Sequence, residues 1–137
     1  MKQVDELIRG EISAVESINA VLGKIKDTNE KSSLEQMLQD HQHAVDNLKR
    51  FAEPEFKANA DSSGPWGAMT TAFAGGASFF GDKAALAALK VGEQHGLDEY
   101  QEAIKDNSIN QEVRTLIQNE LLPNQKKHLQ TINQYMQ

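Results

Sequence analysis

The sequence predicts an all-α protein, an antiparallel four-helix bundle that forms a single domain over residues 1–137. Three observations lead to this fold class. Apolar residues recur at spacings of three and four over four long stretches, which is the period of an amphipathic helix. No alternating stretch rich in β-branched residues, typical of a strand, occurs anywhere. A chain of 137 residues is also long enough for one domain with its own hydrophobic core.

The four helices are expected at about 2–26, 32–52, 82–106 and 109–136. The first shows the helical spacing most clearly, at Val4, Leu7, Ile8, Ala14, Val15, Ile18, Val21, Leu22 and Ile25. Ser32 with Glu35 fits a capping box, which predicts the start of the second helix there. Pro54 should end that helix, because proline disfavours the helical conformation in the residue before it. Asp82, after Gly81, is a suitable N-cap for the third helix.

The fourth helix contains a proline, Pro123, within its apolar pattern. Proline lacks a backbone N–H, and its ring collides with the carbonyl four residues earlier. We therefore expect a kink about one turn before Pro123.

The segment between the second and third helices, 53–81, is too long for a hairpin connection, since such connections in bundles usually have about 2–8 residues. A connection between two parallel helices of about 20 residues must span about 30 Å. We expect a long crossover with a short helix at 65–74 whose Trp66, Met69 and Phe73 pack on the bundle. The alternative is a disordered glycine-rich linker, but linkers contain few aromatic residues and this segment is rich in them.

Composition excludes several classes of function. Twenty acidic residues against fourteen Lys and Arg give a net charge of −6, which argues against a nucleic-acid partner or an anionic membrane surface. The chain has no cysteine, so disulfides, a thiol nucleophile, iron–sulfur clusters and zinc fingers are excluded. No window approaches the roughly 18 apolar residues of a membrane span. The first 27 residues are periodic and charged, unlike a signal peptide. We expect a soluble, cytoplasmic, bacterial protein.

The two halves of the chain resemble each other, with a helical hairpin as the repeating unit. At a constant offset Glu11 aligns with Glu93, and at a slightly larger offset His41 aligns with His128. The first offset also aligns Leu7, Ala14, Ile18 and Leu22 with Leu89, Gly96, Tyr100 and Ile104.

The aligned polar residues lie where apolar ones are expected. At about 100° per residue, the apolar faces of the first three helices centre on Glu11, His41 and Glu93, and His128 lies close to the centre of the fourth. Ionisable groups are rarely buried unless they are paired or bind a metal. One such residue on each helix therefore predicts a polar site in the core.

Two chemistries fit this site, and the sequence leaves both open. Two carboxylates and two neutral imidazoles offer four ligands to one divalent ion and cancel its charge, which suits zinc, or iron or manganese with added water. Alternatively, protonated histidines pair with the glutamates in a metal-free structural network. Gly10 and Gly92, just before the two glutamates, suggest close helix approach. We expect Tyr100 beside Glu93, either as a hydrogen-bond partner or in plain packing.

The sequence resembles the ferritin-like superfamily and, more closely, a bacterial family of four-helix-bundle proteins of unknown function. The resemblance covers nearly the whole chain. It rests on Leu-Ile-Arg-Gly-Glu at 7–11, Phe-Gly-Asp-Lys-Ala at 80–84, Gly-Glu at 92–93, Tyr-Gln-Glu-Ala at 100–103, and His128. It implies an antiparallel bundle with a long crossover between the second and third helices, and no known activity.

Di-iron members of that superfamily carry a Glu on two helices and Glu-x-x-His on the other two. The two glutamates and two histidines of the predicted site match this pattern. The partner carboxylates do not, because Leu38 and Gln125 stand three residues before the histidines. Asp40 and His43 have the required spacing, but His43 lies about 200° from His41 on the solvent face. Like His95, it is expected to be a surface histidine.

We therefore expect a non-enzymatic bundle, with no catalytic residues, whose Glu11, His41, Glu93 and His128 form a core site for one divalent metal ion or a metal-free network. One alternative is an iron- or manganese-dependent redox or storage protein. Another is a helical interaction module that binds a protein partner through the crossover at 66–80. Homo-oligomers are compatible with all three.

Overall fold

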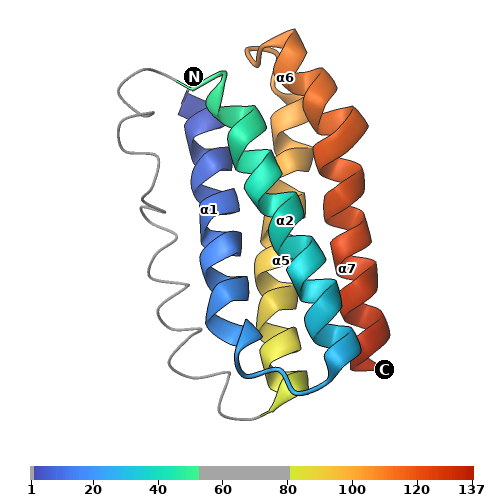
Figure 1. The fold of residues 1–137 in the computed structure, drawn as a ribbon. Helices are drawn as coiled ribbons and strands as arrows, with labels where there is room; N and C mark the ends of the chain where they lie inside the picture. The colour runs from blue at the N-terminus through green and yellow to red at the C-terminus, as the bar shows by residue number, and fades with distance from the viewer. Residues whose placement is uncertain (1, 53–80) are drawn as a thin grey trace.

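The computed structural model describes residues 2–52 and 81–137, which form four antiparallel helical rods (Figure 1). The rods are α1 (Lys2–Leu22), α2 (Thr28–Lys49), α5 (Asp82–Lys105) and a fourth rod made of α6 (Gln111–Leu116), the π-helix η3 (Ile117–Leu121) and α7 (Leu122–Met136). The predicted all-α four-helix fold is confirmed. The predicted helix at 65–74, its packing and the partner surface at 66–80 lie outside the described residues.

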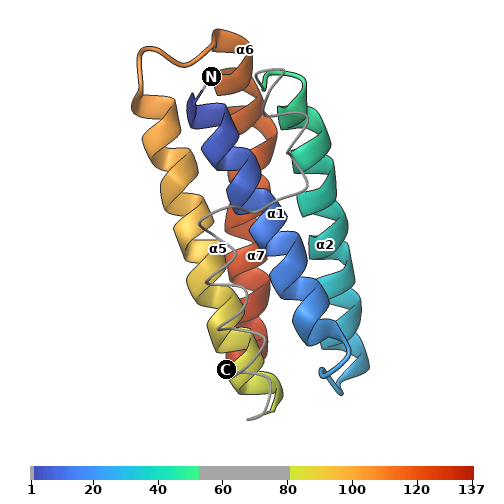
Figure 2. The same cartoon turned by 90° about the vertical axis from the view of Figure 1, so that its left-hand side faces the viewer.

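The rods pack as two hairpins side by side. α1 pairs with α2 and α5 with α7, and α1 also lies along α5 (Figures 1 and 2). α2 ends at one end of the bundle and α5 begins at the other, next to the loop after α1 (Figure 1). α2 and α5 thus run parallel, which is the arrangement that the length of the 53–81 segment predicted.

α2 begins at Thr28, one turn earlier than predicted. Asp27 is its N-cap, and the Asp27 carboxylate accepts the backbone N–H of Glu30 at 3.0 Å. The predicted start at the Ser32 capping box was wrong. Asp27 and Glu30 have the same spacing as that box, and aspartate is as good an N-cap as serine.

α5 begins at Asp82, with Gly81 rather than Asp82 as its N-cap. Gly81 has a φ of 94°, a conformation that glycine adopts without steric cost. The Asp82 carboxylate instead accepts the backbone N–H groups of Lys26 and Asp27 at 3.2–3.3 Å. It thereby joins the α1–α2 loop to the start of α5.

The fourth rod has a π-helix, Ile117–Leu121, in the turn before Pro123, where the sequence predicted a kink. The N–H of Leu122 bonds the carbonyl of Ile117, five residues earlier. The wider turn is a known way to accommodate a residue that disturbs regular helical hydrogen bonding.

The core consists of two apolar clusters with a polar layer between them. One cluster contains Val4, Leu7, Ile8, Ile12, Ala44, Val45, Leu48, Ala52, Tyr100, Ala103, Ile109, Val113, Ile117 and Leu121. The other contains Ile18, Val21, Ile25, Leu34, Met37, Ala85, Leu86, Leu89 and Ile132. On every rod, the buried polar residues fall between members of the two clusters. None of the described helices is long and apolar enough to span a membrane.

Candidate metal centre

The four predicted site residues all lie in the polar layer, one on each rod. Glu11 is 6% exposed, His41 2%, Glu93 3% and His128 3%. The helical phasing that placed them in the core is therefore correct. Buried ionisable groups must find partners, since an uncompensated charge in the interior is very costly.

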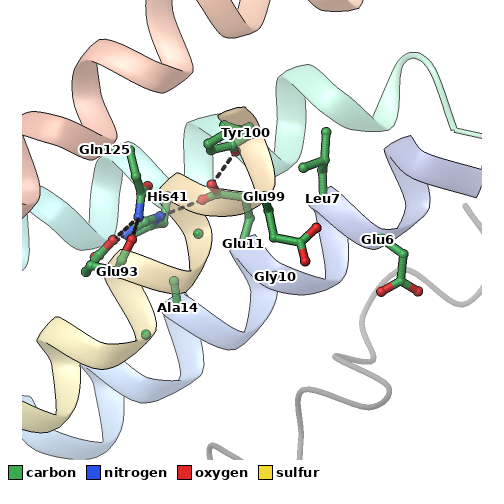
Figure 3. A pocket seen from close by; sticks show the side chains of 12 residues that line it. Glu6, Leu7, Gly10, Glu11, Ala14, His41, Glu93, Glu99, Tyr100 and Gln125 are labelled. Atoms are coloured by element: carbon green, nitrogen blue, oxygen red, sulfur yellow. Dashed lines mark hydrogen bonds and ion pairs between the residues drawn. The ribbon is translucent and has the colours of Figure 1, made fainter. Parts of the chain in front are cut away.

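His41 lies between two carboxylates (Figure 3). Its Nδ1 is 2.5 Å from Glu11 Oε2, and its Nε2 is 2.7 Å from Glu93 Oε1. An ionised carboxylate only accepts hydrogen bonds, so two such partners require a proton on each ring nitrogen. His41 is therefore an imidazolium cation that bridges α1 and α5.

The electrostatics agree with this protonation state. Burial lowers the pKa of His41, but the charges of Glu93 and Glu11 outweigh it and raise the pKa well above its ordinary value. Burial would raise the pKa of Glu93, but the charge of His41 and the nearby His128 bring it down to about 2.

Each carboxylate that pairs with His41 also accepts a hydrogen bond from a second side chain. The hydroxyl of Tyr100, for which a hydrogen bond to Glu93 and plain packing were both left open, donates to Glu11 Oε1. The amide of Gln125 donates to the main-chain oxygen of Glu93 at 2.8 Å and also to its Oε2. Burial, together with the charge of Glu11, raises the pKa of Tyr100 well above its ordinary value, so the phenol remains a neutral donor.

His128 is satisfied on one side only. Its Nε2 is 2.8 Å from Oδ2 of Asp40, a residue that is half-buried. Its Nδ1 is 3.8 Å from Glu93 Oε2 and has no hydrogen-bond partner among the described residues. The rings of His41 and His128 lie close together, with their centroids 4.8 Å apart.

The structure brings three of the four predicted ligands together. His41, Glu93 and His128 each offer one ligand atom, and these atoms all lie within 4.8 Å of one another. Glu11 stands outside this group, because it contacts the far nitrogen of His41.

A family model described as a domain of unknown function, DUF2383, matches residues 1–106. The chain belongs to the DUF2383 family. The match includes three of the predicted site residues and ends before His128. No curated protein and no solved structure matches the chain.

Two residues of this site were not predicted as partners. Gln125 precedes His128 by three residues and shares its helix face, so the spacing indicated a position in the same layer. It was missed because its amide is uncharged and only ionisable residues were considered as members of the site. Asp40 directly precedes His41, about 100° away from the centre of the core face, and its partner lies on α7. The exposed positions expected for His43 and His95 are confirmed.

The two halves of the DUF2383 chain differ in what supports the layer. Gln125 corresponds to Leu38, and Tyr100 corresponds to Ile18, under the offsets that align the glutamates and histidines. Each pair has a polar member that bonds a buried carboxylate and an apolar member that cannot. The two halves therefore share the ionisable residues of the layer, but only the second half supplies the uncharged side chains that donate hydrogen bonds to the glutamates.

A small cavity of about 20 Å³ adjoins the layer between α1 and α5 (Figure 3). It is lined by Glu6, Leu7, Gly10, Glu11, Ala14, His41, Gly92, Glu93, Gly96, Glu99, Tyr100 and Gln125. The prediction of close helix approach at Gly92 was wrong, because a Cβ there would meet no described atom within 4 Å. The close approach is at Gly96, where a Cβ would lie 2.8 Å from Gln125 Nε2.

Proposed function

We propose that this DUF2383 protein binds one divalent metal ion through His41, Glu93 and His128. The observation that carries the proposal is the buried Nδ1 of His128, which has no hydrogen-bond partner among the described residues. When Nε2 donates to Asp40, a neutral His128 has a lone pair on Nδ1. That lone pair and the Glu93 carboxylate oxygen are two acceptors only 3.8 Å apart. A cation that binds both would satisfy them.

The surroundings of both histidines support the same function. Metal-binding histidines usually hydrogen-bond a carboxylate or carbonyl through their other ring nitrogen, which fixes the ring orientation. Asp40 contacts the other nitrogen of His128, and Glu11 contacts the other nitrogen of His41. Tyr100 and Gln125 in turn orient the two glutamates.

Two imidazole nitrogens and one carboxylate oxygen suit zinc best, and iron(II) or manganese(II) with added water next. The cavity of about 20 Å³ beside Glu93 has room for one water molecule, which could complete the ligand set. The ion would supply Lewis acidity. Metal binding requires neutral His41, so the ion would replace a proton of the metal-free network.

The order of the helices, with Glu on the first and third rods and His on the second and fourth, supports a relationship with the ferritin-like bundles. The same residues argue for one ion rather than two. Di-iron sites of that superfamily use a carboxylate three residues before each histidine. Here those positions hold Gln125, whose amide donates to Glu93, and Leu38, which is apolar. A two-iron redox or storage function therefore has less support.

A metal-free structural network is the second candidate, and one observation favours it. His41 already pairs with carboxylates through both nitrogens, so the layer is largely satisfied without an ion. Such networks can fix one arrangement of helices at some cost in stability.

A zinc titration against a chromogenic chelator, on protein freed of metal beforehand, separates the two candidates. We expect one zinc ion per chain. The His128→Gln variant should lose this site, and Asp40→Asn should weaken it by about 10–100-fold, because Asp40 orients His128. His43→Gln and His95→Gln are matched controls, since both histidines are exposed, and should bind as the wild type does.

Unchanged zinc binding in His128→Gln would contradict the proposed site. Absence of binding by the wild type, with an unfolding midpoint that zinc does not move, would assign the layer to the structural network.

A further inference from the structure

The small cavity between α1 and α5 reaches the polar layer from the side of the bundle. Its inner end is formed by Glu11, His41 and Glu93, two of which belong to the proposed ligand set. Figure 3 shows these three side chains converging, with the lining residues Glu6 and Leu7 farther along α1. A volume of about 20 Å³ admits one particle the size of a water molecule.

Four of the residues that line this cavity are small. Gly10 and Ala14 of α1 and Gly92 and Gly96 of α5 all line it. A glycine inside a helix costs about 1 kcal/mol relative to alanine. Packing accounts for Gly96, where a Cβ would collide with the Gln125 amide. Packing against the described residues does not account for Gly92, where a Cβ would meet none of their atoms within 4 Å. Among the described residues, a side chain at position 92 would enter open space beside the cavity that Gly92 lines.

Carboxylates follow the cavity from its outer to its inner end. Glu6 is exposed and Glu99 is 38% exposed, and both line the cavity together with the buried Glu11 and Glu93. In Figure 3 Glu6 lies farther along α1 than Glu11 does. A cleft lined by one sign of charge concentrates the opposite ion and speeds its association.

We propose that this cavity is the route by which a divalent cation reaches and leaves the centre, with Glu6 and Glu99 as the outer carboxylates that attract it. This inference rests on the proposed metal function. In this proposal Gly92, which has no side chain, leaves the route unobstructed. Neither Gly92 nor Glu99 belongs to the ligand set.

The test measures how fast zinc enters metal-free protein and how fast it leaves for an excess of chelator, both by stopped flow. Gly92→Leu should slow loading and release by the same factor, about tenfold or more, because one barrier controls both directions. The equilibrium dissociation constant should stay within about twofold of the wild type. Gly92→Ala should slow both steps less.

The two Gly92 variants also control for helix stiffening. Alanine and leucine have similar helix propensities, so an effect of stiffening alone would slow both variants equally and would overturn the proposal. If Gly92→Leu does not fold, as judged by circular dichroism, the alanine variant still decides, because loading as fast as in the wild type overturns the proposal.

The outer carboxylates are tested by charge removal. Glu99→Gln should slow loading at low salt, and the difference from the wild type should shrink as salt screens the charge. Glu102→Gln is the matched control, since Glu102 lies on the same helix, is 78% exposed and does not line the cavity.

The two failures can be told apart. If the wild type binds no zinc at equilibrium, the proposed function fails and the access route fails with it. If zinc binds but Gly92→Leu loads and releases it as fast as the wild type, only the access route fails.

Discussion

At the scale of single residues, His41 is the centre of the polar layer. Taking a charge out of water is expensive, and one counter-charge often repays the cost only in part. His41 has two carboxylate partners, and each of them has a further donor in Tyr100 or Gln125. Removing one member should therefore leave other buried groups without partners.

Glu11→Leu tests this dependence. The substitution removes the acceptor of His41 Nδ1 and of the Tyr100 hydroxyl at once. Breaking a buried ion pair from one side costs about 3–5 kcal/mol, so we expect a loss of that size in the free energy of unfolding by urea, with chelator present. Glu35→Leu, at an exposed position of α2, should change it by less than about 0.5 kcal/mol. Equal stability of Glu11→Leu and the wild type would show that the pairing contributes nothing.

The pKa shifts predict how metal-free stability depends on pH. The pKa of His41 is raised above its ordinary 6.5, so its contribution is complete below pH 6.5 and is lost as pH rises through the higher folded-state value. The pKa of Glu93 is lowered from 4.5 to about 2, so its contribution is complete above pH 4.5 and is lost as pH falls toward 2.

Among urea midpoints measured at pH 3, 5.5 and 9 with chelator present, the one at pH 5.5 should therefore be the highest. Over the pH range in which each group loses its contribution, the free energy of unfolding should change by up to about 1.4 kcal/mol per pH unit. His43→Gln should leave the profile unchanged, because His43 is exposed. A midpoint that rises steadily from pH 5.5 to 9 would contradict the charged state assigned to His41.

At the scale of the helices, periodicity predicted that four rods exist and which faces they bury, but not where each begins. Two capping patterns of equal spacing begin before Leu34, one at Asp27 and one at Ser32. A local pattern cannot choose between them. The earlier start adds backbone hydrogen bonds to α2, such as the one from Lys31 to the carbonyl of Asp27.

The start of α2 can be tested with two alanine substitutions. Asp27→Ala removes the acceptor of the Glu30 N–H and should cost about 0.5–2 kcal/mol in the free energy of unfolding. Ser32→Ala should be neutral or slightly stabilising, because Ser32 is exposed inside the helix and alanine has the higher helix propensity. The reverse order of the two effects in thermal or urea unfolding would place the helix start at Ser32.

At the scale of the whole molecule, the sequence predicted the members of the polar layer better than their connections. Helical phase depends on one helix at a time, so it located the four ionisable residues. Contacts between rods depend on how the helices are rotated and shifted against one another, which periodicity does not specify. The pairing of Asp40 with His128 and of Tyr100 with Glu11 joins different rods, so neither could be predicted.

The four ionisable residues of the polar layer can be replaced together. Replacing the four ionisable residues, Glu11, His41, Glu93 and His128, with leucine removes every buried charge among them. It would also leave the Tyr100 hydroxyl buried without its acceptor, at a cost of about 1–3 kcal/mol. Gln125 would keep its bond to the main-chain oxygen of residue 93.

Adding Tyr100→Phe to the four leucine substitutions should recover that cost, because phenylalanine has the same ring and no hydroxyl. Replacing a buried ionic network by apolar residues is often neutral or stabilising by about 1–4 kcal/mol. We therefore expect the variant with all five substitutions to be at least as stable against urea as the metal-free wild type. With zinc at about 100 times its dissociation constant, the free energy of unfolding of the wild type should rise by about 2.7 kcal/mol, and that of the variant with five substitutions should not change. A zinc-induced gain in the variant with five substitutions would locate the ion elsewhere, and a variant less stable than Glu11→Leu would show that the layer is needed to pack the two halves of the core.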